Sequence, residues 1–199
     1  MAFRVLGVSG SMREGSHSAR AVKFVLEAAR AHGAETRLVD LRALDLPMYR
    51  PRGGVIETEG VRVANEHVGW ADAFVLASPD YHGSMSGAIK NFLDYYWTEF
   101  AGKAFGYLCA SHEKGLTVMD QMRTAVRQCY GWSLPYGVSF HGDQDFDSTG
   151  VTNEAIARRL RMLARDLVIY GSLIREQFLR DLASDAPDTF VAKYRSSGQ

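Results

Sequence analysis

Hydroxyl and glycine residues gather in one short segment near the N-terminus, SGSMREGSHS at residues 9–18, which contains one arginine, Arg13. The segment follows an apolar run and precedes a stretch with helical spacing. The first turn of a helix offers unpaired N–H groups and a partial positive charge, and serine and arginine side chains add further donors to an anion. The composition favours a phosphate site, although such loops also cap helices without binding a ligand.

Two common nucleotide-binding motifs do not fit this segment. Gly10 and Gly15 match the outer glycines of a nucleoside-triphosphate loop, but Ser16 and His17 stand where that motif requires Lys and then Ser or Thr. The sequence also lacks the dinucleotide fingerprint G-x-G-x-x-G. A monophosphate is therefore the group that best matches these residues.

A second polar turn, PDYHGSMSGAIKNFLD at residues 79–94, follows the third apolar run. Together with Gly10-Ser11-x-Arg13-x-x-Ser16, it resembles the NADPH-dependent FMN reductase family of flavodoxin-like proteins. The second signature of that family reads approximately Pro-x-Tyr-Asn-Gly-Ser-x-Pro-Gly-x-Leu-Lys-Asn. The resemblance extends over residues 1 to about 178. A flavin needs a flat apolar face and backbone N–H donors, which Tyr81 and a tight glycine-containing turn can supply.

The resemblance implies that FMN is the cofactor and assigns residues to it. The phosphate would be held by residues of the first segment, namely Ser9, Ser11, Arg13, Ser16 and Ser18, with His17 beside them. The isoalloxazine edge would be lined by Pro79, Asp80, Tyr81, His82, Gly83 and Ser84, and the site would be completed by Ser111 and His112.

Three residues depart from the family pattern. His82 stands where asparagine is usual, Ser86 replaces the common proline, and Ser18 occupies a position often filled by asparagine. His82 is also a candidate proton donor, because imidazole titrates near neutral pH. Hydride transfer, however, depends more on positioning than on a protein acid. Lys90 and Asn91 lie within a predicted helix, where an anchoring or surface role is expected.

Two further polar segments have an open interpretation. Residues 111–115, SHEKG, follow the fourth apolar run, and Lys114 could contact the ribityl chain or the phosphate of a nicotinamide cofactor, or lie in a solvated loop. Residues 143–154 imitate the spacing of a calcium loop, but the glycine at its sixth position and a preceding helix are missing. We expect a polar loop there and no metal site.

Short apolar runs alternate with helical patterns along the chain. The runs cover residues 3–9, a stretch near Glu35, residues 71–78 and 103–111, and a weaker stretch around Pro135. This alternation predicts a three-layer α/β fold of the flavodoxin-like type, with a five-stranded parallel sheet and helices on both faces. Leu160, Leu163 and Leu167 mark a final helix, which Thr152 or Asn153 caps.

The chain has 199 residues, with 23 basic and 23 acidic groups. Its length predicts one domain over residues 1–199, with a C-terminal tail from about residue 183. The neutral balance argues against a nucleic-acid partner and against a typical acidic electron carrier. Cys109 and Cys129 are expected to be reduced core thiols. Without a signal-peptide pattern or a membrane-length apolar run, we expect a cytoplasmic protein.

The resemblance implies an oxidoreductase in which NADPH, or NADH, passes a hydride to N5 of FMN. Electrons would then go to free flavin, a quinone or another small acceptor. The sequence leaves open which acceptor and which donor are used, and whether FMN stays bound. The alternative is a non-enzymatic flavin-binding electron carrier. The aromatic residues at 95–100 and the methionines near residue 120 exceed what one inward helix face needs, so together with the resemblance they predict a homodimer or homotetramer.

Overall fold

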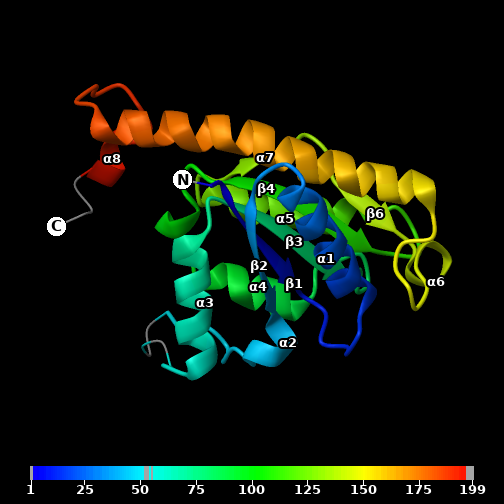
Figure 1. Cartoon of the computed structure of the whole chain (residues 1–199). Coiled ribbons are helices and arrows are strands. Elements are labelled where there is room, and N and C mark those ends of the chain that lie inside the picture. Colours follow the sequence, from blue (N-terminus) through cyan, green and yellow to red (C-terminus); the bar gives the residue numbers. More distant parts are fainter. Residues whose placement is uncertain (1, 52–53, 55, 196–199) are drawn as a thin grey trace.

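Six parallel strands form one sheet in the computed structural model, which describes residues 2–51, 54 and 56–195. The strand order is β2-β1-β3-β4-β5, and β6 also pairs with β4 (Figure 1). The strands are β1 (Arg4–Ser9), β2 (Glu35–Asp40), β3 (Ala73–Pro79), β4 (Ala104–Ala110), β5 (Trp132–Ser133) and β6 (Val138–Phe140). The predicted flavodoxin-like parallel sheet is confirmed.

The fifth position of the sheet is divided between two short strands. β5 pairs with the start of β4, and β6 pairs with its end. Pro135 lies between them and has no N–H group to donate to the sheet. A Cβ atom on Gly137 would lie 2.8 Å from the carbonyl oxygen of Tyr107, so the chain passes very close to β4 at that point. The single strand predicted around Pro135 is therefore interrupted by a local loop.

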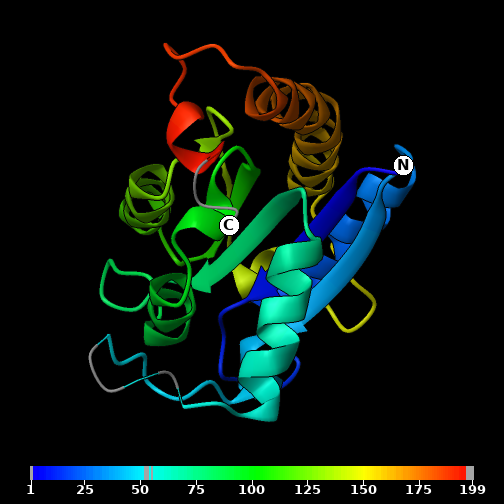
Figure 2. The same ribbon diagram turned by 90° about the vertical axis from the view of Figure 1, so that its left-hand side faces the viewer.

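Helices cover both faces of the sheet, as predicted (Figure 2). Helices α1 (His17–Arg30) and α7 (Glu154–Ala183) pack on one face. The other face carries α3 (Glu59–Trp70), α4 (Gly87–Asp94) and α5 (Leu116–Gln128). The shorter elements are α2 (Leu41–Leu44), η1 (Thr98–Phe100), α6 (Gly142–Asp145) and α8 (Ala192–Arg195).

Side chains of β3 alternate between the two layers, as the period of a strand requires. Val75 faces the α1/α7 layer, whereas Phe74 faces the opposite layer and stacks on Phe105, with ring centroids 4.7 Å apart. Asn91 of α4 accepts a hydrogen bond from the backbone N–H of Tyr49 at 2.8 Å. The anchoring role expected for this helix residue is thus present.

The aromatic residues at 95–100 are divided between the core and the surface. Tyr96 and Phe100 are buried, as is Met122 of α5, whereas Trp97 is 63% exposed. They form one aromatic cluster between α4, η1 and the sheet, in which Phe100 meets Phe74 edge-on at 5.2 Å. Burial within one chain thus accounts for Tyr96, Phe100 and Met122 but not for Trp97, and the predicted homodimer or homotetramer stays a prediction.

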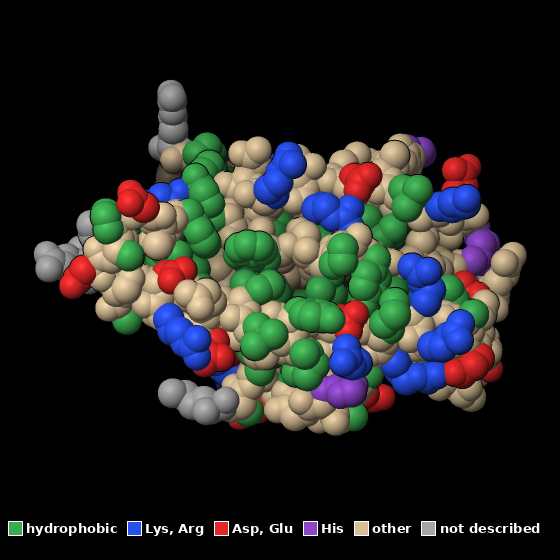
Figure 3. Space-filling view, turned by 90° about the horizontal axis from the view of Figure 1, so that it is seen from above, with side chains coloured by type: hydrophobic (Ala, Val, Ile, Leu, Met, Phe, Trp, Pro, Cys, Tyr) green, Lys and Arg blue, Asp and Glu red, His purple; other side chains and the backbone are tan. Residues whose placement is uncertain are grey.

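Helix α7 is the longest element of the fold and begins at the predicted cap. Asn153 accepts hydrogen bonds from the N–H groups of Ala155 and Ile156. The outward face carries exposed apolar side chains, including Ile169, Tyr170 and Leu173. Figure 3 views the molecule from above this helix and shows hydrophobic side chains interspersed with those of Lys or Arg.

The segment after Ala183, expected to be a tail, folds back on the domain. Val191 is fully buried against Ala101 and Phe178. Phe190 stacks on Tyr130 with an interplanar angle of 6°. This packing covers the amino-terminal end of the sheet, which lies opposite the polar turns described below.

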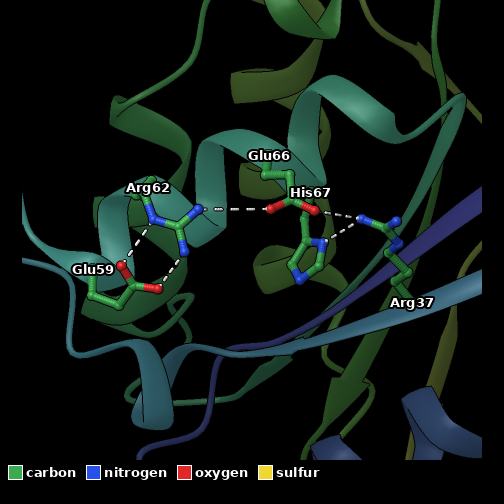
Figure 4. Close-up of polar contacts among 5 residues, drawn as sticks. All are labelled: Arg37, Glu59, Arg62, Glu66 and His67. Carbon is green, nitrogen blue, oxygen red and sulfur yellow. Dashed lines mark hydrogen bonds and ion pairs between the residues drawn. The ribbon is translucent and has the colours of Figure 1, made fainter.

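A polar network joins α3 to β2 on the surface (Figure 4). Arg37 donates to Glu66 and to Nδ1 of His67, both at 3.1 Å, and Arg62 pairs with Glu59 and Glu66. Burial first, and the nearby Arg37 second, lower the pKa of His67.

Among the residues that the structure describes, no helix is both long and apolar enough to cross a membrane.

Candidate functional site

The carboxyl ends of β1, β3, β4 and β6 meet at one edge of the sheet, where two adjoining hollows lie. The first, of about 600 Å³, is lined by ten of the predicted residues: Ser11, Arg13, Ser16, His17, Ser18, Pro79, Asp80, Tyr81, Ser111 and His112. The second, of about 680 Å³, is lined by His82, Gly83 and residues 113–117, and shares Asp80, Ser111 and His112 with the first. Parallel α/β sheets bind ligands at this edge.

The first loop forms a cradle of hydroxyl groups, with Arg13 beside them, at the start of α1. The Ser16 hydroxyl accepts a hydrogen bond from the N–H of Ala19 at 3.2 Å and caps the helix. Ser11 Oγ accepts one from the N–H of Arg13 at 3.3 Å. No ion pair joins the Arg13 guanidinium to another residue of the described chain, so its charge is available to a ligand. The capping and phosphate interpretations are compatible here.

Ser9 does not reach this cradle. It lies in β1, is fully buried, and its hydroxyl has no hydrogen-bond partner among the described residues. Gly10, which follows it, needs to be glycine because a Cβ atom would lie 2.0 Å from Cγ1 of Ile89. The loop therefore crosses α4 at very close range before it turns toward the hollow.

The third-strand turn is a two-residue hairpin. Tyr81 and Ser84 exchange backbone hydrogen bonds of 3.0 and 3.1 Å, and His82 and Gly83 both have left-handed backbone angles, with φ of 58° and 74°. This is the pattern of a type I′ turn, which prefers Asn, Asp or Gly at its first central position, and histidine is among the few other residues enriched at positive φ. Tyr81 is half exposed, so its ring is available as a flat apolar surface.

Asp80 connects this hairpin to the loop after β4. Its two carboxylate oxygens accept hydrogen bonds from the N–H of Gly83 and from the Ser111 hydroxyl, each at 2.8 Å. Ser111 Oγ in turn accepts from the N–H of Glu113 at 3.1 Å. One carboxylate therefore sets the separation of two loops that form both hollows.

Two serines of the turn have structural contacts rather than a place in either hollow. Ser84 Oγ donates to Oε1 of Gln121, on α5, at 2.9 Å. Ser86 caps α4 and donates to the carbonyl oxygen of Gly10 at 2.6 Å. The replacement of the family's proline by Ser86 thus adds a hydrogen bond between the two signature loops.

A wall of the first hollow that sequence reasoning did not assign to the site comes from residues 142–148. Arg20 donates to the carbonyl oxygen of Asp147 at 2.8 Å, and His17 lies 3.7 Å from an Asp143 carboxylate oxygen. Gly142 lets the His17 ring approach, because a Cβ atom there would lie 2.3 Å from Nδ1. The short apolar run at 138–140 could have indicated this wall in the sequence, because it forms a strand, β6, that ends at the same sheet edge.

The acidic residues of this wall stabilise their own loop. Asp145 accepts hydrogen bonds from the N–H of His141 at 2.7 Å and from the Asn153 side chain at 2.7 Å. Asp147 Oδ1 accepts from the N–H of Thr149 at 2.7 Å. Across the described residues, no group of three or more His, Cys, Asp or Glu side chains is arranged to hold a metal.

Charged groups of both signs line the first hollow, with Arg13, His17 and Arg20 beside Glu14, Asp80, Asp143 and Asp147. Burial is the largest cause that lowers the pKa of His17, Asp143 opposes this effect, and Arg20 and Arg13 reinforce it. A further pair of imidazoles lies on the rim, where Nδ1 of His112 is 2.7 Å from Nε2 of His141. The hydroxyls, Arg13 and the helix terminus fit a phosphate, and Tyr81 with the hairpin fits a planar ring, so the residues present fit FMN.

Known proteins resemble this chain in sequence and in fold. An NADPH azoreductase of Bacillus sp. (strain OY1-2) is 27% identical over 177 residues, which cover 87% of this chain and 96% of that protein. An FMN-dependent NADPH-azoreductase of Staphylococcus aureus is 28% identical over 148 residues, which cover 70% of this chain and 77% of that protein.

Among solved structures, the NAD(P)H:(acceptor) oxidoreductase FerB of Paracoccus denitrificans superposes with a TM-score of 0.72 at 19% identity, over 86% of this chain and 98% of that chain. An NADH:FMN oxidoreductase in its apo form also superposes with a TM-score of 0.72 at 19% identity, over 85% of this chain and 90% of that chain. These likenesses establish the fold. Residues 3–145, well over half of the chain, match the sequence pattern of one family, and the chain therefore belongs to the NADPH-dependent FMN reductases.

Proposed function

We propose that this oxidoreductase binds FMN in the first hollow and uses NADPH to reduce a small acceptor that enters from the second. Bound FMN would accept a hydride from the nicotinamide and pass two electrons on. The observation that carries the proposal is the junction of the two hollows at Asp80, Ser111 and His112, which places a phosphate cradle beside an open chamber. Family membership favours an enzyme over the non-enzymatic carrier.

In this proposal, Ser11, Arg13, Ser16 and Ser18 bind the phosphate and His17 lines their edge. Pro79, Asp80, Tyr81, His82 and Gly83 position the ring, together with Ser111 and His112. Ser9 and Ser84 support these residues from behind. Lys114 lines the second hollow and offers a positive charge to a nicotinamide cofactor's phosphate.

The binding site can be tested by titrating the purified protein with FMN and with FAD while the quenching of flavin fluorescence is followed. Arg13→Ala should raise the Kd for FMN roughly tenfold, because a charge-assisted hydrogen bond contributes about 1.5–3 kcal/mol. Arg30→Ala is the matched control. Arg30 is the last residue of α1, whereas Arg13 lies in the loop before its first residue, so this variant should leave the Kd for FMN unchanged. Equal affinity of wild type and Arg13→Ala would remove Arg13 from the site.

Activity should appear as steady NADPH consumption in the presence of FMN and an acceptor. The names of the relatives add azo compounds to the quinones and free flavin worth testing. NADPH over NADH, a homodimeric or homotetrameric state and a cytoplasmic location stay proposals. Bound flavin that NADPH does not reduce without a partner reductase would contradict the enzymatic function.

A further inference from the structure

Two histidines from different loops form a direct pair at the rim shared by the hollows. His112 follows β4 and His141 follows β6, and their rings meet with centroids 4.5 Å apart at an angle of 76°. Nδ1 of His112 lies 2.7 Å from Nε2 of His141, which is hydrogen-bonding distance. His112 is exposed and lines both hollows.

This geometry limits the pair to one exchangeable positive charge. A nitrogen–nitrogen contact of 2.7 Å requires one hydrogen between the rings. If both imidazoles were cationic, two N–H groups would point at each other across that distance, which is strongly unfavourable. The pair therefore alternates between a neutral state and a state with one extra proton.

The proton has one accessible position from which it can leave. In the singly charged pair, Nε2 of His112 and Nδ1 of His141 each carry a hydrogen besides the shared one. Nδ1 of His141 is buried and has no hydrogen-bond partner within the described chain. Because Nδ1 of His112 is occupied by the contact with His141, Nε2 of His112 is the nitrogen that can exchange a proton with a ligand or with water.

Charged groups of both signs surround the pair. They are Asp80 after β3, Glu113 and Lys114 in the loop of His112, Asp143 and Asp145 in α6, and Arg13, His17 and Arg20 around the start of α1. The carboxylates of Asp80 and Asp145 accept hydrogen bonds within their loops and hold the two histidines in place indirectly, through Ser111 and the His141 N–H.

The reaction class needs one proton in addition to the hydride. For a two-electron acceptor, the balance is NADPH + H⁺ + acceptor giving NADP⁺ and the doubly reduced acceptor with two added hydrogens. The nicotinamide supplies both electrons and one hydrogen. The second hydrogen has to reach the acceptor as a proton from a protein acid or from water.

We propose that the His112–His141 pair supplies this proton, with Nε2 of His112 as the donor and His141 as the positioning residue that holds its ring and shares its charge. The N–H bond at Nε2 breaks as an N–H or O–H bond forms on the acceptor, and the H⁺ of the overall balance, taken up from solvent, then reprotonates Nε2. This inference rests on the proposed function. His82, a candidate donor in the sequence, has an imidazole that makes no hydrogen bond to any described residue.

The pair itself can be tested on the apo protein by following imidazole nitrogen signals during a pH titration by NMR. His112 and His141 should take up one proton between them, because their nitrogens lie 2.7 Å apart, and in His141→Phe the signal of His112 alone should report that uptake. His32→Gln, which changes an exposed histidine far from the site, is the control. Independent uptake of two protons would overturn the pairing argument.

The role of the His112–His141 pair as proton donor is tested by two rates measured separately. These are the anaerobic reduction of bound flavin by NADPH and the subsequent reduction of a quinone. The ratio of the quinone rate to the flavin rate should fall about 100-fold in His112→Gln, the range of general acid catalysis, and about 10-fold in His141→Phe. The quinone rate of wild type should fall with rising pH at the midpoint found by NMR. His32→Gln should change neither rate.

The two proposals fail in different ways. If NADPH does not reduce FMN bound to wild type, the proposed function fails and the donor role of the pair fails with it. If NADPH reduces the flavin but the ratio in His112→Gln equals that of wild type, the inference alone is overturned.

Discussion

Lys103 is a buried cation whose desolvation should be measurable as a pH-dependent stability. It is 6% exposed, donates to the carbonyl oxygen of Val68 at 2.9 Å, and lies 5.6 Å from the centre of the Phe74 ring. Burial lowers the pKa of Lys103 from 10.5 to about 8, with a smaller contribution from Arg175, whereas Asp72 opposes the shift. The neighbouring carboxylate compensates little, because Asp72 already pairs with Arg4 at 3.0 Å.

The direction in which stability changes with pH depends on which state of the protein binds more protons. Between the pKa of about 8 in the native state and 10.5 in the unfolded chain, the unfolded state binds more protons. Stability therefore rises with pH across that window, by about 1.4 kcal/mol per pH unit. From pH 7 to pH 9, Lys103 alone should add about 1.4 kcal/mol to the free energy of unfolding, since roughly one full unit of this interval lies above the native pKa.

The measurement is urea unfolding of wild type and of Lys103→Met at pH 7 and pH 9. The comparison is needed because burial raises the pKa of Cys109 to about 12, which lowers stability as the pH exceeds 9 in both proteins alike. The wild-type midpoint should gain about 0.7 M urea relative to the variant, for a denaturant slope of about 2 kcal/mol/M. Parallel behaviour of the two proteins between pH 7 and 9 would refute the reasoning.

Further predictions concern the site and the stability of the fold. Asp80→Ala removes two hydrogen bonds to a carboxylate and should raise the Kd for FMN at least tenfold in a fluorescence titration, since each contributes about 1.5–3 kcal/mol; an unchanged Kd would contradict the bridging role. Gly142→Ala should displace His17 and weaken FMN binding. Gly69→Ala adds a methyl group that meets open space on α3, and thermal unfolding should show the fold stabilised by about 0.5–1 kcal/mol. Because the pKa of His67 is lowered below 6.5, stability should be lost as the pH falls below that value, and urea unfolding of His67→Gln should show a smaller loss than wild type.

The elements of the fold could be predicted because their signals are local. The apolar runs of β1, β3 and β4 and the spacing of Leu160, Leu163 and Leu167 follow from side-chain periodicity within one element. The aromatic residues at 95–100 could not be interpreted in this way, because the depth of the core depends on neighbours from η1, α5 and β3 together. The same holds for Val191, whose partners Ala101 and Phe178 come from distant parts of the chain.

The sequence by itself indicated the family, a polar loop with the composition of a phosphate site and a tight glycine-containing turn, since each is a contiguous motif. Only the tertiary structure decided that residues 142–148 form a wall of the site, that Asp80 links the hairpin to Ser111, and that His112 meets His141. The physical reason is that these contacts join residues far apart in the sequence, with separations of 31 positions for Asp80 and Ser111, 29 for His112 and His141, and 127 for Arg20 and Asp147. The crossovers of a parallel sheet bring them to one edge without leaving a pattern in either segment.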